Sequence, residues 1–173
     1  MAEVFTIRRI RRDEVDAHRD VRLRALAEAP TAFETTHAEA AARPPEAWVT
    51  RTLELAESDR STMFVADEGT NRLAGMLGTY LDAAGNAELY SMWVDPAARR
   101  HGLGRRLIDA NAEWAREHDF KQLLLWVTEG NEPAVALYLA CGFELTGESQ
   151  PHPTYEGHRE LEMRLALIYG KRC

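Results

Sequence analysis

Cysteine is scarce in this chain of 173 residues, which has only Cys141 and Cys173. Two cysteines without a repeated spacing do not make a disulfide framework, so a reducing cytoplasm is the expected location. No apolar stretch approaches the ~20 residues that span a bilayer. The arginines between Arg8 and Arg12 lead into acidic residues and not into an apolar run, which argues against a secretory signal. The sequence therefore predicts a protein without a membrane partner.

Positive charge is also in short supply, because 21 Lys and Arg residues stand against 28 Asp and Glu residues, for a formal net charge of -7. This balance argues against a nucleic-acid partner, since phosphate binding draws on a surplus of basic residues, and it favours cationic molecules such as amines. The histidines show no metal-ligand spacing, so no metal is expected. The length and a hydrophobic content of 45% suit one domain over residues 1–173.

The apolar periodicity predicts seven strands and four helices in the order β-α-α-β-β-β-α-β-α-β-β. Strands are expected within 4–10, at 62–67, 73–81, 86–94 and 121–128, from 142, and around 161–167. Helices are expected from Asp13, which is placed to cap the first one, and at 44–57, 103–118 and 133–139, with 31–43 irregular. The apolar run in 121–128 suits a strand buried on both faces. The pattern predicts a mixed α/β (α+β) sheet in a single domain.

A basic, glycine-rich loop joins the strand ending at Val94 to the helix beginning at about Leu103. Gly102 and Gly104 allow close backbone approach, and the N–H groups at the helix start favour an anion. Four arginines and a histidine surround them, as a pyrophosphate requires. The alternatives are a plain helix start with solvated arginines, or a dinucleotide-binding turn. The second fails because Leu107 replaces its third glycine, its glycines lie eight residues past Val94, and no acid follows about twenty residues on.

The loop resembles the phosphate-binding signature Gln/Arg-x-x-Gly-x-Gly/Ala of the GCN5-related N-acetyltransferase superfamily. Arg99, Gly102 and Gly104 match that signature. The family's second motif, N-x-x-A-x-x-L-Y-x-x-x-G-F, is matched by Asn131, Ala134, Leu137, Tyr138, Gly142 and Phe143. Each motif alone is weak, but their separation and the order of elements agree as well, so the resemblance covers roughly 4–167.

The resemblance implies a mostly antiparallel mixed sheet of about seven strands, with helices on both faces and with the fourth and fifth strands splayed to admit the pantetheine arm of acetyl-coenzyme A. No metal is implied. The implied cofactor contacts are Met92, Trp93, Val94, Arg99, Arg100, His101, Gly102, Leu103, Gly104, Arg105, Asn131 and Tyr138.

Amine acylation needs a base that frees the amine and an acid that protonates the leaving thiolate. By resemblance, Tyr138 is the candidate acid, and the alternative is a packing tyrosine. Glu88 is the candidate base, fourteen residues before Gly102, and the alternative is a solvent-facing strand carboxylate. Cys141 has no histidine near it in sequence, so direct attack in a ternary complex is preferred to a covalent intermediate.

The acceptor is expected among residues of the loop after the first helix, the strand before the phosphate loop and the last hairpin loop. The candidates are Phe33, Thr36, Tyr90 and Tyr155. We predict an N-acetyltransferase acting on a small-molecule amine and carry a homodimer as a further expectation. A protein N-terminal or lysine acetyltransferase, or a non-catalytic acyl-CoA sensor, stays open as the alternative.

Overall fold

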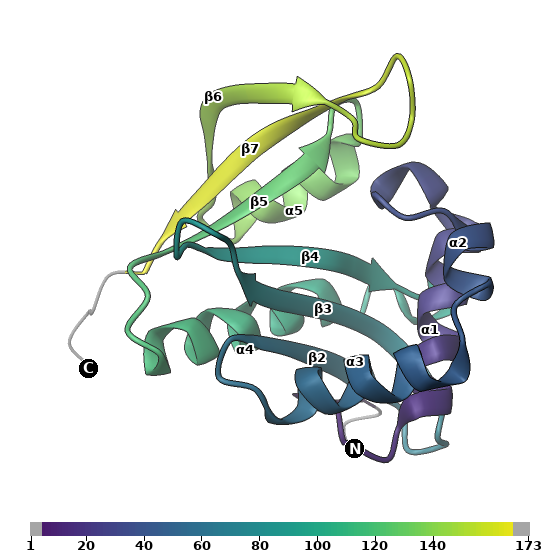
Figure 1. Ribbon diagram of the computed structural model, residues 1–173. Helices are drawn as coiled ribbons and strands as arrows, with labels where there is room; N and C mark the ends of the chain where they lie inside the picture. The colour runs from purple at the N-terminus through teal and green to yellow at the C-terminus, as the bar shows by residue number, and fades with distance from the viewer. Residues whose placement is uncertain (1–4, 168–173) are drawn as a thin grey trace.

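The computed structural model describes residues 5–167, which form one seven-stranded sheet in the order β1-β2-β3-β4-β5-β7-β6 (Figure 1). Every neighbouring pair is antiparallel except β4 and β5, which are parallel. The strands are β1 (Thr6–Arg9), β2 (Ser61–Asp67), β3 (Leu73–Leu81), β4 (Ala87–Val94), β5 (Gln122–Thr128), β6 (Glu144–Pro151) and β7 (Arg159–Ala166). The helices are α1 (Val15–Glu28), α2 (His37–Ala41), α3 (Pro45–Glu57), α4 (Leu103–Glu117) and α5 (Glu132–Ala140), with 3-10 turns η1 (Pro30–Ala32) and η2 (Pro96–Ala98). No helix between residues 5 and 167 is long and apolar enough to cross a membrane.

Helices cover both faces of the sheet, as the neighbouring residues Met76 and Leu77 of β3 show. Successive strand residues point to opposite faces. Leu77 belongs to a core cluster with Leu107 of α4, whereas Met76 belongs to a second cluster with Val21 of α1 and Leu55 of α3. Figure 1 shows α4 on one side of the sheet and α1 to α3 on the other. The expected mixed fold with helices on both faces is therefore confirmed.

The segment 31–43, expected to be irregular, contains η1 and the short helix α2. Thr36 begins α2 with a capping box, in which its hydroxyl accepts from the Glu39 N–H at 3.2 Å and the Glu39 carboxylate accepts from the Thr36 N–H at 2.8 Å. The threonine followed by glutamate three residues later is the sequence sign of such a start. The prediction missed the helix because α2 is only five residues long and has little apolar periodicity.

The first helix begins without the cap expected from Asp13. The N-cap position is taken by Glu14, whose side chain makes no capping hydrogen bond. Its carboxylate instead accepts from Arg8 at 2.9 Å and from the Arg11 N–H at 2.8 Å. The ion pair to β1 therefore replaces the local cap, which is a tertiary contact that the local sequence does not reveal.

The prediction that both faces of β5 are buried is wrong for one face. Leu123, Leu125 and Val127 are buried, whereas the alternating Leu124 and Trp126 are only half-buried. The Trp126 side lines a cavity and is not covered by a helix.

The sheet parts between β4 and β5, because their pairing covers only Ala87 with Leu123, Glu88 with Leu124 and Leu89 with Leu125. Beyond Leu89 the two strands diverge, and Figure 1 shows β5 turning away from β4. A bulge in β4 shifts its register against β3 at this point, where Ser91 adopts a left-handed φ of 60°. Bulges bend a strand and increase its twist, so this one helps to open the gap.

Candidate active site

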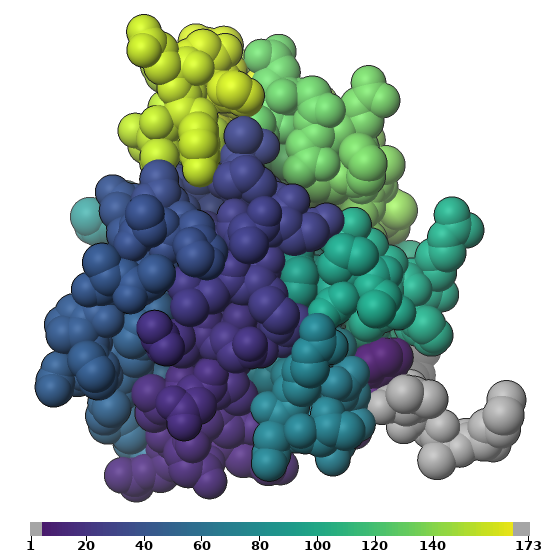
Figure 2. All heavy atoms as spheres, turned by 90° about the vertical axis from the view of Figure 1, so that its right-hand side faces the viewer, coloured from purple at the N-terminus to yellow at the C-terminus, as the bar shows by residue number. Residues whose placement is uncertain are grey.

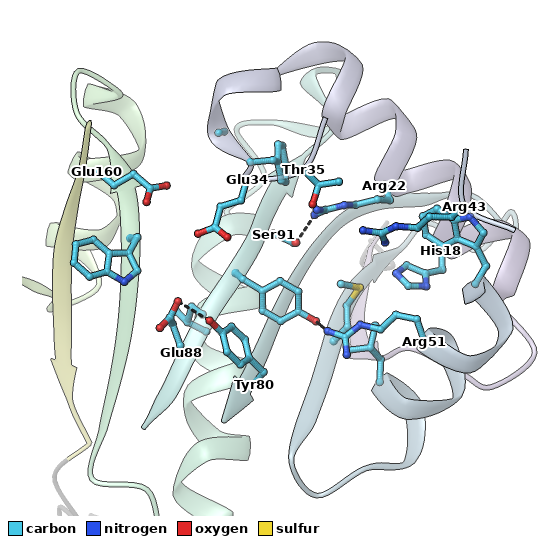
Figure 3. Close-up of a pocket in the computed structure, with 18 residues that line it drawn as sticks. His18, Arg22, Glu34, Thr35, Arg43, Arg51, Tyr80, Glu88, Ser91 and Glu160 are labelled. Carbon is cyan, nitrogen blue, oxygen red and sulfur yellow. Dashed lines mark hydrogen bonds between the residues drawn. The ribbon is translucent and has the colours of Figure 1, made fainter. Parts of the chain in front are cut away.

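A cavity of about 370 Å³ lies beside the point where β4 and β5 part. Its walls come from α1, the segment after η1, α3, β4, β5 and β7 (Figure 3). A volume in this range suits a small molecule rather than a large peptide surface. The charged and hydrogen-bonding residues that line it are His18, Arg22, Glu34, Thr35, Arg43, Arg51, Tyr80, Glu88, Tyr90, Ser91 and Glu160.

Glu88 lies at the middle of the three β4–β5 pairs and lines the cavity. Its Oε1 accepts a hydrogen bond from the Tyr80 hydroxyl at 2.9 Å, a contact drawn in Figure 3. Burial raises the pKa of Glu88 above its ordinary value, and the negative charge of Glu34 adds to the rise, while the Tyr80 hydrogen bond opposes it. A half-buried carboxylate with a raised pKa at the edge of a cavity is suited to accept a proton.

Tyr90 lines the cavity close to Glu88, and its side chain is held by contacts with Arg51, Tyr80 and Gly78. Its hydroxyl accepts from Arg51 at 2.7 Å, and its ring packs edge-on against Tyr80 with centroids 5.3 Å apart. Gly78 of β3 makes room for that ring, because a Cβ on Gly78 would lie 2.5 Å from a Tyr90 ring carbon. The glycine in mid-strand is therefore required by close packing and not by a turn.

Three arginines and a histidine form the opposite end of the cavity, and they come from α1, from α3 and, for Arg43, from the segment between α2 and α3 (Figure 3). Arg22 donates to the Ser91 hydroxyl and lies over the Phe33 ring, with its guanidinium carbon 4.9 Å from the centroid. Arg43 lies over the Trp48 ring at 5.5 Å. Burial lowers the pKa of His18 to about 4, and the charge of Arg22 adds to this, so His18 is neutral at pH 7.

Glu160 stands on the same side of the cavity as Glu88, away from the arginines, and Glu34 lies between them and Arg22 (Figure 3). Burial raises the pKa of Glu34, and the charge of Glu160 raises it further. The loop after β6 holds this region in place, because Thr154 donates to the Glu34 carbonyl and His152 Nε2 lies 3.2 Å from the Thr31 carbonyl. Figure 2 shows this yellow loop resting on the dark blue segment after α1.

The glycine-rich loop has the open helix start that the sequence predicted. Gly102 is the N-cap of α4 with a left-handed φ of 68°, and no atom lies within 4 Å of the place of a Cβ on it. The first intrahelical bond runs from the Arg106 N–H to the Gly102 carbonyl at 3.1 Å. The preceding N–H groups of the first turn, from Leu103 to Arg105, have no acceptor among residues 5–167, so they can hold an anion.

The other predicted cofactor residues differ in what their side chains can do. Arg99 donates to the Val94 carbonyl at 3.0 Å and to Glu28 at 2.9 Å, so its guanidinium is engaged within the protein. The Trp93 indole donates to Glu28 at 2.9 Å and points towards α1, which leaves only its backbone for a cofactor. Exposed side chains remain at Arg100, His101 and Arg105, while Met92 is half-buried.

Two further positions of the predicted cofactor site serve the packing of α4 and α5. A Cβ on Gly104 would lie 2.9 Å from Leu137, so this glycine allows the two helices to approach. Asn131 is the N-cap of α5, where its side chain accepts from the Ala134 N–H at 3.4 Å. The amide of Asn131 therefore fixes the start of the helix that carries Tyr138.

Tyr138 is 6% exposed and belongs to the core cluster under the parted strands, with its ring edge-on to Phe143 at 5.5 Å. Burial raises its pKa above the ordinary value, so the hydroxyl is protonated at neutral pH. It does not line the cavity that contains Glu88. Cys141, one turn away, is half-buried and burial raises the pKa of its thiol, which weakens it as a nucleophile, while Cys173 lies outside the described residues.

The predicted acceptor residues divide into two pairs. Phe33 and Tyr90 line the cavity. Thr36 instead caps α2, and Tyr155 packs against His152 in the loop after β6 at a centroid distance of 5.2 Å, so neither lines it. A binding role for these four stays a prediction.

The sequence reasoning missed the arginines of the cavity, namely Arg22, Arg43 and Arg51, together with Tyr80 and Glu160. Arg22 offered a signal, because it falls in the buried stripe of α1 between Val21 and Ala25, where a charged residue needs a reason. No group of three or more metal-ligating side chains gathers within residues 5–167.

Comparison with solved structures shows an acetyltransferase fold. The chain superimposes on a GNAT-family acetyltransferase of Streptococcus pneumoniae with a TM-score of 0.79, at 20% identity over 94% of this chain and 98% of that one. It superimposes on yncA of Salmonella typhimurium, a structure with its cofactor acetyl-CoA, with a TM-score of 0.78 at 17% identity over 98% of both chains. At these identities the likeness defines the fold alone.

The acetyltransferase (GNAT) family profile matches residues 23–143, and the chain belongs to this family. A curated relative, the mycothiol acetyltransferase of Geodermatophilus obscurus, is 36% identical over 120 residues, which are 62% of this chain and 39% of that protein. The chain therefore spans about two fifths of the length of the curated relatives that it matches. The resemblance found in the two sequence motifs is confirmed.

Proposed function

We propose that this protein is an N-acetyltransferase that moves the acetyl group of acetyl-CoA to a primary amine. The observation that carries the proposal is the parting of β4 and β5 directly beyond Leu89, with Glu88 at the edge of a cavity on one side and the open start of α4 nearby. A thioester placed in the gap reaches the cavity from the cofactor side. The family membership supports the same reaction.

The reaction proceeds by direct attack in a ternary complex. Glu88 takes a proton from the bound ammonium, either directly or through a water, and the neutral amine attacks the thioester carbonyl. The carbon–sulfur bond breaks as the amide forms, the thiolate takes a proton from Tyr138, and the proton that the nitrogen loses on becoming an amide returns Tyr138 to its neutral form. The pyrophosphate of the cofactor is held by the N–H groups between His101 and Arg105, and the pantetheine pairs with the free edge of β4 at Met92 and Val94.

The cavity volume of about 370 Å³ favours a small-molecule acceptor over a protein side chain presented on a large surface. The name of the relatives, mycothiol acetyltransferase, also points to a small-molecule enzyme. We extend the proposal to a cytoplasmic protein that forms homodimers, and light scattering on the purified chain gives the molar mass that tests the dimer.

Thiol release from acetyl-CoA, followed with a panel of small primary amines, tests the reaction. We expect turnover above the hydrolysis background for at least one amine. The Glu88→Gln variant is expected to lower kcat/KM by about 10²–10⁴-fold, and Tyr138→Phe to lower kcat in the same range, because each removes a proton-transfer group. Glu148→Gln, a change at an exposed residue of β6, is the control and keeps full activity.

Two outcomes contradict the proposal. Tight acetyl-CoA binding without thiol release for any amine, peptide or lysine acceptor identifies a sensor domain. Full activity in Tyr138→Phe removes that residue as the acid and assigns it to packing against Phe143.

A further inference from the structure

The wall of the acceptor cavity built by α1, α3 and the segment just before α3 carries a concentrated positive charge. Arg22, Arg43 and Arg51 all line it, and His18 beside them is neutral. Figure 3 shows the arginine side chains reaching towards the same space from the right-hand side of the cavity. Three guanidinium groups in one small cavity repel one another, because each is a permanent charge, and Arg22 and Arg51 are also partly removed from solvent.

Two of these charges are not neutralised by the protein. Arg51 pairs with Glu54 at 2.8 Å, but neither Arg22 nor Arg43 forms an ion pair with a carboxylate anywhere in residues 5–167. Burial is the main cause that lowers the pKa of Arg22 to about 10; the charge of Arg43 contributes to the fall, and the charges of Tyr90 and Glu34 oppose it without cancelling it. The protein therefore holds Arg22 in an unfavourable place, which a bound anion would relieve.

The rest of the cavity has the opposite sign. Glu88 and Glu160 lie on the far side from the arginines, and Glu34 lies between them and Arg22, near enough for its charge to act on Arg22 (Figure 3). Tyr90 and Ser91 lie on β4 between the two groups and are fixed by Arg51 and Arg22 respectively. A ligand with a positive group at one end and a negative group at the other matches this arrangement, whereas a simple amine leaves the arginine end empty.

We propose that the acceptor is a small amine that also carries an anionic group, a carboxylate or a phosphate, which is bound by Arg22 and Arg43. The inference rests on the proposed function, since it names the substrate class of the same site. The amine lies towards Glu88 at the parted strands, and the anion lies towards α1 and α3. Guanidinium groups bind both kinds of anion through paired N–H donors, and bonds of this kind are shorter and stronger than neutral ones.

This assignment refines the expectation drawn from net charge. The chain as a whole carries a charge of -7 and attracts cations in general. The cavity differs from that average, because its arginines act at short range where solvent screens them less. The overall charge then steers the ammonium end, and the arginines select the molecules that have an anion as well.

Three acceptors that share one carbon skeleton and one primary amine test the inference. They differ only at the far end, which is a carboxylate, a phosphonate or an uncharged amide. We expect kcat/KM to be about tenfold to a hundredfold higher for an anionic acceptor than for the amide, the range that a charged hydrogen bond gives. The comparison of carboxylate with phosphonate shows which anion the cavity takes.

The Arg43→Gln variant is the matched change, because Arg43 is exposed and its side chain lies over the Trp48 ring without an ion pair to a carboxylate among the described residues. We expect its anion-to-amide ratio of kcat/KM to fall by about tenfold. Arg60→Gln, at an exposed arginine that does not line the cavity, is the control and keeps the wild-type ratio. Arg22→Lys, which retains the charge and loses the planar fork, is expected to lower the ratio less than Arg43→Gln, and circular dichroism checks that each variant is folded.

Calorimetry with the N-acetylated products, in the presence of coenzyme A, separates this inference from the proposed function. One outcome is that no amine is acetylated, but the anionic product binds at least tenfold more tightly than its amide and Arg43→Gln removes this difference in affinity. The proposed reaction is then wrong, and the proposed anion site is supported. If amines are acetylated with a ratio near one that Arg43→Gln does not change, the anion site is overturned.

Discussion

At the scale of single residues, the Tyr80–Glu88 hydrogen bond sets the ionisation of the proposed base. Burial raises the pKa of Glu88, and the Tyr80 hydroxyl opposes that rise by donating to the charged form at 2.9 Å. The carboxylate must be ionised to accept a proton, so any further rise in its pKa costs activity at the acidic side of the pH range. Tyr80 therefore acts through Glu88 as a positioning residue.

Tyr80→Phe removes this hydrogen bond and leaves the aromatic packing against Tyr90. The pKa of Glu88 then rises, because the Tyr80 hydrogen bond that lowers it is lost. The acidic limb of the kcat/KM profile therefore moves to higher pH. We expect a loss on the order of tenfold on that limb and a smaller one at alkaline pH. A uniform loss at every pH, with the limb unmoved, contradicts this role and indicates damage to packing alone.

Only part of the site could be predicted residue by residue. Glu88 and Tyr138 follow from motifs whose spacing the chain preserves. Tyr80 and the arginines do not, because their convergence depends on how β3 pairs with β4 and on how α1 and α3 pack over the sheet. A local sequence pattern predicts which face of a helix is buried, but it does not predict which side chains of other elements contact that face.

At the scale of elements, Asp95 joins the end of β4 to α1 and to the turn η2 that leads into the glycine-rich loop. Its carboxylate accepts from Arg24 at 2.9 Å, from Arg72 at 2.8 Å and from the Ala97 N–H at 3.0 Å. Burial alone would raise the pKa of Asp95, but these partners outweigh it and lower the pKa below its ordinary value. The entry to the phosphate loop is thus held by one buried charge.

Asp95→Asn keeps the shape and the acceptor for Ala97, and it removes both the charge and the oxygen that accepts from Arg24 and Arg72. We expect a loss of about 1–3 kcal/mol in the free energy of unfolding, because two arginines lose their ionised partner, and an increase in the KM for acetyl-CoA. A carboxylate whose pKa is lowered by folding stabilises the protein above its ordinary pKa of ~4 and ceases to do so as the pH falls through the native value. The difference in Tm between the two proteins therefore narrows towards pH 4 and below.

The control for this prediction is Asp59→Asn, at a side chain that is 92% exposed. A surface change of this kind stays within about 0.5 kcal/mol. A loss in Asp95→Asn no larger than in the control, or one that does not depend on pH, shows that the three bonds of Asp95 do not hold the loop.

Element order was the part of the fold that the sequence predicted well, since apolar periodicity and turn residues act locally. The strands β3 and β4 and the helices α3 and α4 fall within a residue or so of the expected bounds. The helix α2 was missed because it is only five residues long, and the cap of α1 was missed because Glu14 pairs with Arg8 of β1. The open face of β5 at Trp126 was missed because an unbroken apolar run does not distinguish a helix-covered face from a ligand cavity.

At the scale of the whole molecule, two parts of the sheet meet at only three residue pairs between β4 and β5. One part is β1 to β4 with α1 to α4, and the other is β5 to β7 with α5. The acceptor cavity lies along this seam and takes walls from both parts, including Tyr90 on one side and Trp126 on the other. One core cluster joins the two parts below the gap, and the proposed cofactor position adds a contact across the gap itself.

Hydrogen exchange measured with and without acetyl-CoA tests this view of the seam. Beyond Leu89 the edge of β4 that faces away from β3 has no partner strand, so the amides between 90 and 94 that point to this edge are open to solvent unless the pantetheine pairs with them. We expect acetyl-CoA to slow exchange most at 90–94 of β4 and in the first turn of α4, and to stabilise the fold by about 2.7 kcal/mol at a hundredfold excess over its Kd. Amides of α3, which does not border the gap, serve as the internal control. Their exchange is expected to slow only as much as the global stabilisation of the fold predicts. Binding that raises Tm without selective protection of β4 contradicts a cofactor in the gap, because a ligand elsewhere stabilises the chain without covering that edge.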